Sequence, residues 1–107
     1  MKLRLRDNNA DVTAAWRVHF ADLCASGHVD VSYGDIFDVD VVAAVVSPAN
    51  SFGFMDGGID AVYLRRFGFA FHDRVRAAID AQHGGELPVG SAIVVDTDDA
   101  QFPKLIV

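Results

Sequence analysis

Cysteine, basic residues and long apolar runs are all scarce in this sequence of 107 residues. Cys24 is the single cysteine, so no disulfide can form within the chain, and we expect a reducing, cytoplasmic environment. No apolar run approaches the roughly 18 residues of a membrane-spanning helix. The charged start, Met1–Arg6, is not followed by the apolar stretch of a secretion signal. We therefore expect neither a membrane span nor a signal peptide.

Positive charge is the second shortage. Lysine and arginine together number nine against fifteen acids, and every acid except Glu86 is an aspartate, which gives a net charge of −6. A negative surface argues against nucleic acid as a partner, because binding to its phosphates normally needs a basic face. An anionic ligand would have to be held locally, by backbone N–H groups. The hydrophobic share of 51% is ordinary for one compact folded domain.

The first part of the sequence predicts a strand, a helix and a second strand. Polar and apolar residues alternate over 2–6 and again over 28–33, which is the period of half-exposed strands. Asp7, Asn8 and Asn9 can start a helix between them, and Gly27 can end it. We expect this strand–helix segment to occupy residues 1–27.

The rest of the sequence predicts further strands and a long helix. Val41–Val46 is apolar at every position, which is typical of a central strand covered on both faces. A glycine-rich loop follows Ser47–Pro48 and leads into a helix predicted over 60–81. Residues 92–95 and 105–107 predict two more strands. The order of elements predicts an α/β fold with a mixed sheet.

Ligands of open α/β sheets collect outside the carboxyl ends of the strands. Two segments fall there: Gly34–Asp35–Ile36 and the loop from Ser47 to Asp60. Glycines in the loop let the backbone approach a ligand, and the first N–H groups of a helix attract an anion. The sequence contains neither the P-loop motif nor the G-x-G-x-x-G fingerprint of dinucleotide-binding folds. Considered alone, such a loop can equally be a simple connection.

Specific residues favour a ligand-binding loop over a simple connection. Gly34–Asp35–Ile36 precedes the apolar strand, and Ser47–Pro48–Ala49–Asn50–Ser51 follows it. Gly57–Gly58–Ile59–Asp60–Ala61–Val62 then opens the predicted helix, Phe67–Gly68 closes the motif, and Leu87–Ala92 precedes the next strand. In order and spacing, residues 29–107 resemble the macro domain family. The resemblance implies a three-layer α/β fold, with a mixed central sheet flanked by helices, and ADP-ribose as the ligand. Because the chain stops inside an apolar strand, we expect the C-terminal part of that fold to be missing.

The resemblance also implies a role for each matching residue. Asp35 would accept a hydrogen bond from the adenine amino group, with the Ile36 backbone beside it. The backbone N–H groups of Gly57, Gly58 and Ile59 would bind the distal ribose and the diphosphate. No further cofactor is implied.

Three more residues belong to the expected ligand-binding set: Asn50, Asp60 and Tyr63. Asn50 would hold the hydroxyls of that ribose, and Asp60 would orient or activate water in family members that hydrolyse ADP-ribosyl groups. These two are the catalytic candidates, and a hydrolytic step would be attack of water on the anomeric carbon. Tyr63, in the first turns of the helix, is included among the ligand-binding residues.

The sequence departs from the family pattern at several positions. Ser47 stands for the first asparagine of the motif, Asp56 for its first glycine and Leu64 for the helical histidine of some hydrolases. The lysine nucleophile of another subgroup and the second loop of the family have no counterpart. These departures leave three functions open: an ADP-ribosyl hydrolase, a non-catalytic reader of ADP-ribosylated proteins or metabolites, and a truncated structural copy.

Structural explanations remain open for the same residues. Asp35 and Asn50 can form Asx turns, and Asp60 can act as an acid in the first helical turn. Phe52 or Phe54 can stack on a ligand or close the loop. His19, Cys24 and His28 do not share a helix face, so we expect no metal site. Self-association, or a partner chain that covers the truncated edge, is a further expectation.

Overall fold

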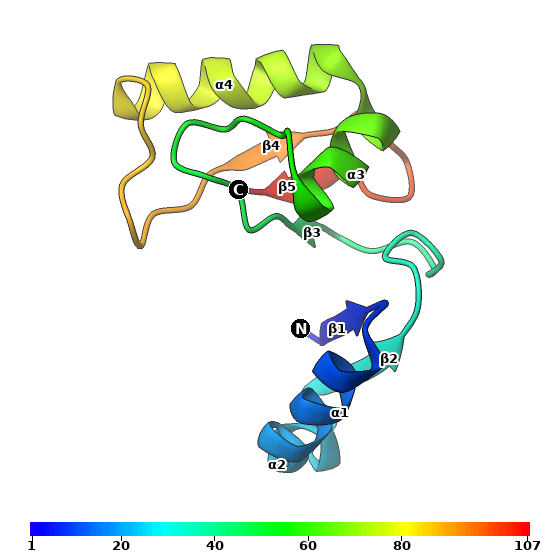
Figure 1. Ribbon diagram of the computed structural model, residues 1–107. Coiled ribbons are helices and arrows are strands. Elements are labelled where there is room, and N and C mark those ends of the chain that lie inside the picture. The colour runs from blue at the N-terminus through cyan, green and yellow to red at the C-terminus, as the bar shows by residue number, and fades with distance from the viewer. The chain divides into compact units, whose positions relative to one another are not determined.

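The computed structural model describes residues 1–107, which divide into two compact units, Met1–Val39 and Asp40–Val107. The first unit is blue to cyan in Figure 1 and the second runs from there to red. Together they contain helices and a mixed sheet, so the predicted α/β class is confirmed. None of the helices is long and apolar enough to cross a membrane. That the whole chain forms one domain stays a prediction.

The first unit is a strand–helix–strand unit. Strand β1 (Leu3–Asp7) pairs in parallel with β2 (Val29–Tyr33), and α1 (Ala10–His19) and α2 (Ala21–Ala25) connect them. The Asn9 side chain caps α1 by accepting hydrogen bonds from the N–H groups of Asp11 and Val12. The predicted single helix is wrong at Phe20, where the backbone leaves helical geometry and α2 begins.

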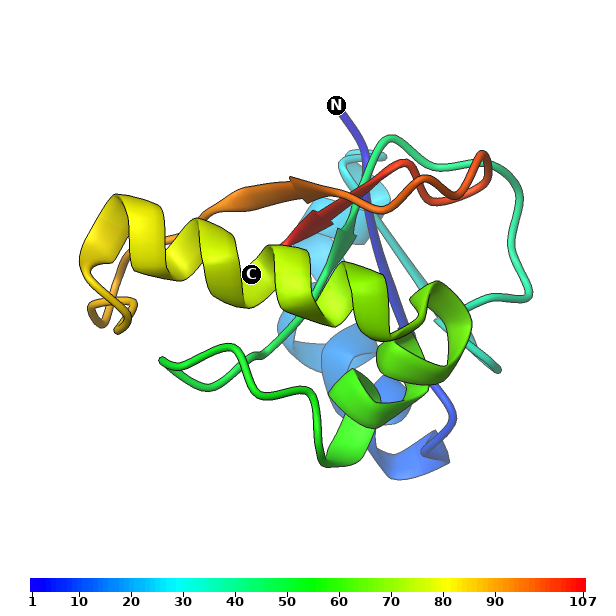
Figure 2. The same cartoon turned by 90° about the horizontal axis from the view of Figure 1, so that it is seen from above.

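The second unit is a three-stranded mixed sheet with two helices. Strand β5 (Lys104–Ile106) lies in the middle, parallel to β3 (Val45–Val46) and antiparallel to β4 (Val94–Asp96). Helix α3 (Gly58–Phe67) precedes α4 (Phe69–His83), and α4 runs along the sheet in both views (Figures 1 and 2). The single helix predicted over 60–81 is wrong at Gly68, whose φ of 89° ends α3 and redirects the chain.

The sheet of the second unit buries one face. Val45, Val95 and Leu105 are buried together with apolar residues of α3 and α4, the largest being Tyr63, Phe71, Val75 and Ile79. Strand β3 is shorter than the predicted Val41–Val46, and Val46 on the other face is 58% exposed. Within the second unit one face of β3 is uncovered, and a central strand covered on both faces stays a prediction. Within this unit β3 lies at the edge of the sheet and pairs only with β5.

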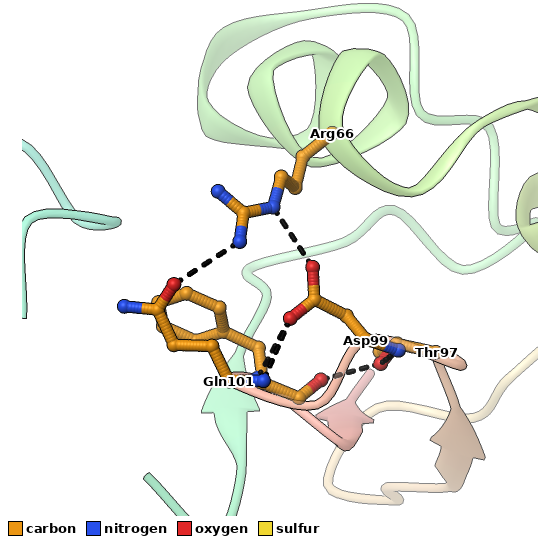
Figure 3. A network of polar contacts seen from close by, with 5 residues as sticks. Arg66, Thr97, Asp99 and Gln101 are labelled. Atoms are coloured by element: carbon orange, nitrogen blue, oxygen red, sulfur yellow. Dashed lines mark hydrogen bonds and ion pairs between the residues drawn. The ribbon is translucent and has the colours of Figure 1, made fainter. Parts of the chain in front are cut away.

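A polar network fixes the connection between β4 and β5 (Figure 3). Asp99 accepts hydrogen bonds from the N–H groups of Gln101 and Phe102, at 2.9 and 3.1 Å. Its other carboxylate oxygen accepts from Arg66 Nε of α3 at 2.9 Å, and Arg66 also donates to the Gln101 side chain. The arginine holds the pKa of the Asp99 carboxyl below its usual range. This acidic turn thus joins the sheet to α3, the helix that begins at the glycine-rich loop.

Candidate functional site

The carboxyl ends of β3 and β5 meet at one edge of the second unit. The Ser47 N–H donates to the Ile106 carbonyl at 2.9 Å, so the chain after β3 starts beside the end of β5. A hollow of about 300 Å³ lies there, lined by Ser47, Pro48, Ala49, Ser51, Leu87, Pro88, Val89, Gly90, Ser91 and Val107. The loop from Ser47 to Asp60 therefore begins at the edge of the sheet where the sequence predicts a ligand.

Ser47 and Asp60 form a buried pair at the two ends of this loop. Their exposed fractions are 5% and 6%, and the Ser47 hydroxyl donates a hydrogen bond to Asp60 Oδ1. Burial raises the pKa of the Asp60 carboxyl, the Ser47 hydrogen bond opposes the rise, and the charge of Asp56 adds to it. The sequence identified Ser47 only as a departure from the family motif. Its place directly after an apolar strand and before a helix that begins with an acid was the available signal.

Tyr63 lies one turn further along α3 and is also buried. Its hydroxyl donates to the Val46 carbonyl at 3.0 Å, so the ring joins α3 to the end of β3. Burial, with a smaller contribution from Asp60, raises the pKa of Tyr63 to about 12. The hydroxyl therefore stays protonated near neutral pH and serves as a donor to the backbone. The ligand-binding role assigned to Tyr63 stays a prediction.

Asn50 organises the first half of the loop. Its Oδ1 accepts from the N–H groups of Phe52 and Phe54, at 3.1 and 3.2 Å, and its Nδ2 donates to the Phe54 carbonyl at 2.7 Å. This is the Asx-type structural role that the sequence left open. The Asn50 side chain is exposed. Its role in holding ribose hydroxyls stays a prediction.

The middle of the loop packs against α4. A Cβ on Gly53 would lie 2.8 Å from Ile79 Cδ1 and 3.2 Å from Val75 Cγ1, and φ of Gly53 is +76°. Met55 is buried as well. These contacts fix the position of the loop before it reaches the glycine pair that follows.

The aromatic residues of the loop lie on its outer side. Phe52 and Phe54 are exposed, with ring centroids 6.5 Å apart. The Arg76 guanidinium lies 4.1 Å from the centroid of the Phe54 ring, a cation–π contact that occupies one ring face. Phe52 is therefore the better placed of the two for stacking on a ligand.

Gly57 and Gly58 form the open end of the loop. Gly57 is the N-cap of α3, and no side chain caps the first N–H groups of the helix. A Cβ on either glycine would meet nothing within 4 Å, and the φ of +56° at Gly58 favours glycine. Asp56, just before them, is exposed. The start of α3 therefore presents unpaired N–H groups, with their partial positive charge, at an uncrowded surface.

The other predicted residues belong to the first unit. Asp35 is exposed and forms an Asx turn, because its Oδ1 accepts from the Phe37 N–H at 2.8 Å. Ile36 follows it in the same turn. The structure thus brings the loop residues and Tyr63 together in the second unit, while Asp35 and Ile36 lie in a separate unit. No group of three or more His, Cys, Asp or Glu side chains is arranged to hold a metal ion.

Comparison with known proteins bears on this loop directly. The model of the macro domain family matches residues 46–107, more than half of the chain, including the whole loop and α3. No curated protein matches the sequence. The match begins at the last residue of β3 and runs through β5, so it covers nearly all of the second unit. The chain belongs to the macro domain family.

Proposed function

We propose that this chain binds ADP-ribose and ADP-ribosylated groups, with the diphosphate at the start of α3. The observation that carries the proposal is the open glycine pair, Gly57 and Gly58, before a helix without a side-chain cap. In a macro domain with net charge −6, backbone N–H groups are the suitable donors for an anion. Macro domains bind ADP-ribose in general, and the family match supports this ligand.

The helix terminus does not supply all of the affinity. A terminus stabilises an anion by about 0.3–1 kcal/mol, or ~2 kcal/mol when partly buried. A micromolar dissociation constant needs roughly 8 kcal/mol. We therefore propose further contacts from Asn50 and Ile59 to the distal ribose. For the first unit, considered by itself, we propose that Asp35 and the Ile36 backbone recognise adenine.

We further propose that the chain is a reader rather than a hydrolase. A group that activates water has to reach it, whereas the Asp60 carboxylate is buried and accepts the Ser47 hydroxyl. The Asn50 amide is engaged on both its oxygen and its nitrogen by the loop backbone. We therefore propose that Asp60 and Asn50, the two catalytic candidates of the sequence, shape the loop and do not activate water.

Calorimetry with ADP-ribose tests the binding proposal. We expect a dissociation constant in the micromolar range for the wild-type chain and weaker binding for Gly57→Val, whose side chain would cover the N–H groups of α3. Ala25→Val, at the exposed end of α2 in the first unit, is the control, because it adds the same kind of apolar side chain to the surface away from the loop. Absence of heat and of a thermal shift at millimolar ADP-ribose would refute the proposal.

Incubation with a mono-ADP-ribosylated protein separates the reader from the hydrolase. A reader retains the modified protein and releases no ADP-ribose over hours. Release by the wild-type chain, abolished in Asp60→Ala, would show that Asp60 acts in hydrolysis and would overturn the reader proposal. The finding would leave the binding proposal intact.

A further inference from the structure

Arg6 is an arginine whose side chain is largely enclosed in the first unit. It lies in β1 in register with Ser32 of β2, and its side chain is only 14% exposed. A guanidinium is seldom removed from water unless hydrogen bonds replace the lost hydration. The hydrogen-bond partners of the Arg6 guanidinium therefore indicate its structural role.

The Arg6 guanidinium makes hydrogen bonds to Ser32, in β2, and to Asp35, in the turn that follows β2. Nη1 donates to Ser32 Oγ at 3.0 Å, and Nε donates to the Asp35 carbonyl at 2.6 Å. Nη2 lies 3.8 Å from a carboxylate oxygen of Asp38, whose side chain is 89% exposed. An exposed ion pair of that length contributes little, so the hydrogen bonds to Ser32 and Asp35 are the contacts that matter.

Gly34 is the residue that lets the guanidinium reach Asp35. A Cβ at Gly34 would lie 2.2 Å from Arg6 Nη2 and 2.8 Å from Cζ. The φ of +148° at Gly34 is also a conformation that side chains rarely adopt. The glycine before Asp35 thus leaves room for an arginine that comes from another strand.

The contact with Arg6 is one of three that fix Asp35. The Asp35 carbonyl accepts from both Arg6 Nε and the Asp38 N–H, the latter at 3.1 Å. The Asp35 side chain accepts from the Phe37 N–H through Oδ1. With the backbone and one carboxylate oxygen held, the direction of the second oxygen, Oδ2, is set while the residue remains exposed.

We propose that Arg6 is a positioning residue for adenine recognition. It holds the Asp35 backbone so that the Asp35 carboxylate is oriented, before any ligand arrives, to accept a hydrogen bond from the exocyclic amino group of the base. This inference rests on the proposed function of Asp35 as the residue that binds adenine. A carboxylate held in place rejects a base with a carbonyl in place of that amino group, because two acceptors would face each other.

The experiment compares ADP-ribose with its hypoxanthine analogue, inosine diphosphate ribose, by calorimetry. The wild-type chain should prefer ADP-ribose by about tenfold or more, since a hydrogen bond to a charged group discriminates on that scale. In Arg6→Met the preference should fall to about threefold or less, a loss of roughly 0.7 kcal/mol or more. The matched control is Arg4→Met, in the same strand and on the same face, whose side chain makes none of these contacts.

Arg6→Lys provides a second readout that needs no ligand. It keeps the positive charge but lacks the planar fork that reaches both Ser32 and Asp35. Amide hydrogen exchange at Phe37 and Asp38 should accelerate in this variant and stay unchanged in Arg4→Lys. The variant also keeps the proposal open to refutation if Arg6→Met does not fold.

Each outcome of these measurements bears on one of two ideas. A wild-type chain that prefers adenine, with an equal preference in Arg6→Met or unchanged exchange in Arg6→Lys, would overturn the role of Arg6 alone. A wild-type chain that binds neither ligand would overturn the proposed function and this inference with it. If Arg6→Met loses the preference for ADP-ribose and Arg4→Met retains it, the result would support Arg6 as a positioning residue.

Discussion

The Ser47 hydroxyl donates a hydrogen bond to the Asp60 carboxylate, and both side chains are buried. The bond joins the end of β3 to the first turn of α3 and so closes the glycine-rich loop between them. Nearby, Tyr63 makes a second bond between α3 and β3 through the Val46 carbonyl. The open glycine pair therefore lies on a helix start that is fixed to the sheet by two side chains.

Replacing Ser47 by alanine removes the hydroxyl donor to Asp60. A buried carboxylate that loses its partner keeps the cost of desolvation, so we expect Ser47→Ala to lower the free energy of unfolding by about 1–3 kcal/mol at neutral pH. Urea denaturation measures the change. Ser51→Ala is the control, since only the backbone carbonyl of Ser51 is used, in a bond from the Leu87 N–H. Equal stability of the two variants would contradict the role assigned to the pair.

Asp60→Asn tests the pH dependence of the same pair. Burial raises the folded-state pKa of Asp60 above its ordinary value of 3.8, so the native chain binds this proton before the unfolded chain as pH falls. The free energy of unfolding of the wild type, relative to Asp60→Asn, should therefore rise as pH falls through the folded-state pKa. It should level off below 3.8. Urea titrations at several pH values measure this difference, and a constant difference or a rise toward high pH would contradict it.

The sequence predicted most elements because their signals are local. The alternation around Leu5 and Val31 and the helix start at Asn9 need only neighbouring residues, and β1, α1 and β2 appear there. The long helix was wrong at Gly68, because helical spacing of apolar residues continues across a residue whose φ of 89° ends the helix. The extent of β3 was wrong because a run of apolar residues does not reveal how many neighbouring strands will pair with it.

The site was predictable in position but only partly in detail. The spacing from Asn50 to Asp60 marked the loop and the start of α3, since motif and strand context are linear features. The bond between Ser47 and Asp60, and the contact of Arg6 with Asp35 across 29 residues, depend on how separate segments fold together. The resemblance to macro domains gave Asp60 the role of a water-activating acid, which stays a prediction. Its burial was not readable from the sequence.

Asp99→Asn tests the polar network that joins the acidic turn to α3. The substitution can keep the caps on Gln101 and Phe102 but replaces the oxygen that accepts from Arg66 Nε with a donor. We expect a loss of about 1–2 kcal/mol in the free energy of unfolding. Asp98→Asn is the matched control in the same turn, because the ion pair between Asp98 and Arg74 is more exposed and should change stability by less than about 0.5 kcal/mol. Equal losses in both variants, measured in urea, would contradict the importance of Arg66.

Gly53→Ala and Gly57→Ala separate the structural glycine of the loop from the one proposed to face the ligand. A Cβ at Gly53 would press on Ile79 and Val75 at a φ of +76°, so we expect a loss of about 1–3 kcal/mol in the free energy of unfolding. Gly57 has an extended backbone with φ of −152°, and a Cβ added there would meet nothing within 4 Å, so alanine should change stability by less than about 0.5 kcal/mol.

If the diphosphate binds at the start of α3, Gly57→Ala should nevertheless weaken ADP-ribose binding several-fold, because its methyl group occupies space beside the N–H donors. Thermal unfolding without ligand and calorimetry with ADP-ribose measure the two effects separately. A Gly57→Ala variant that keeps both stability and affinity would show that the ligand does not approach the helix at this glycine.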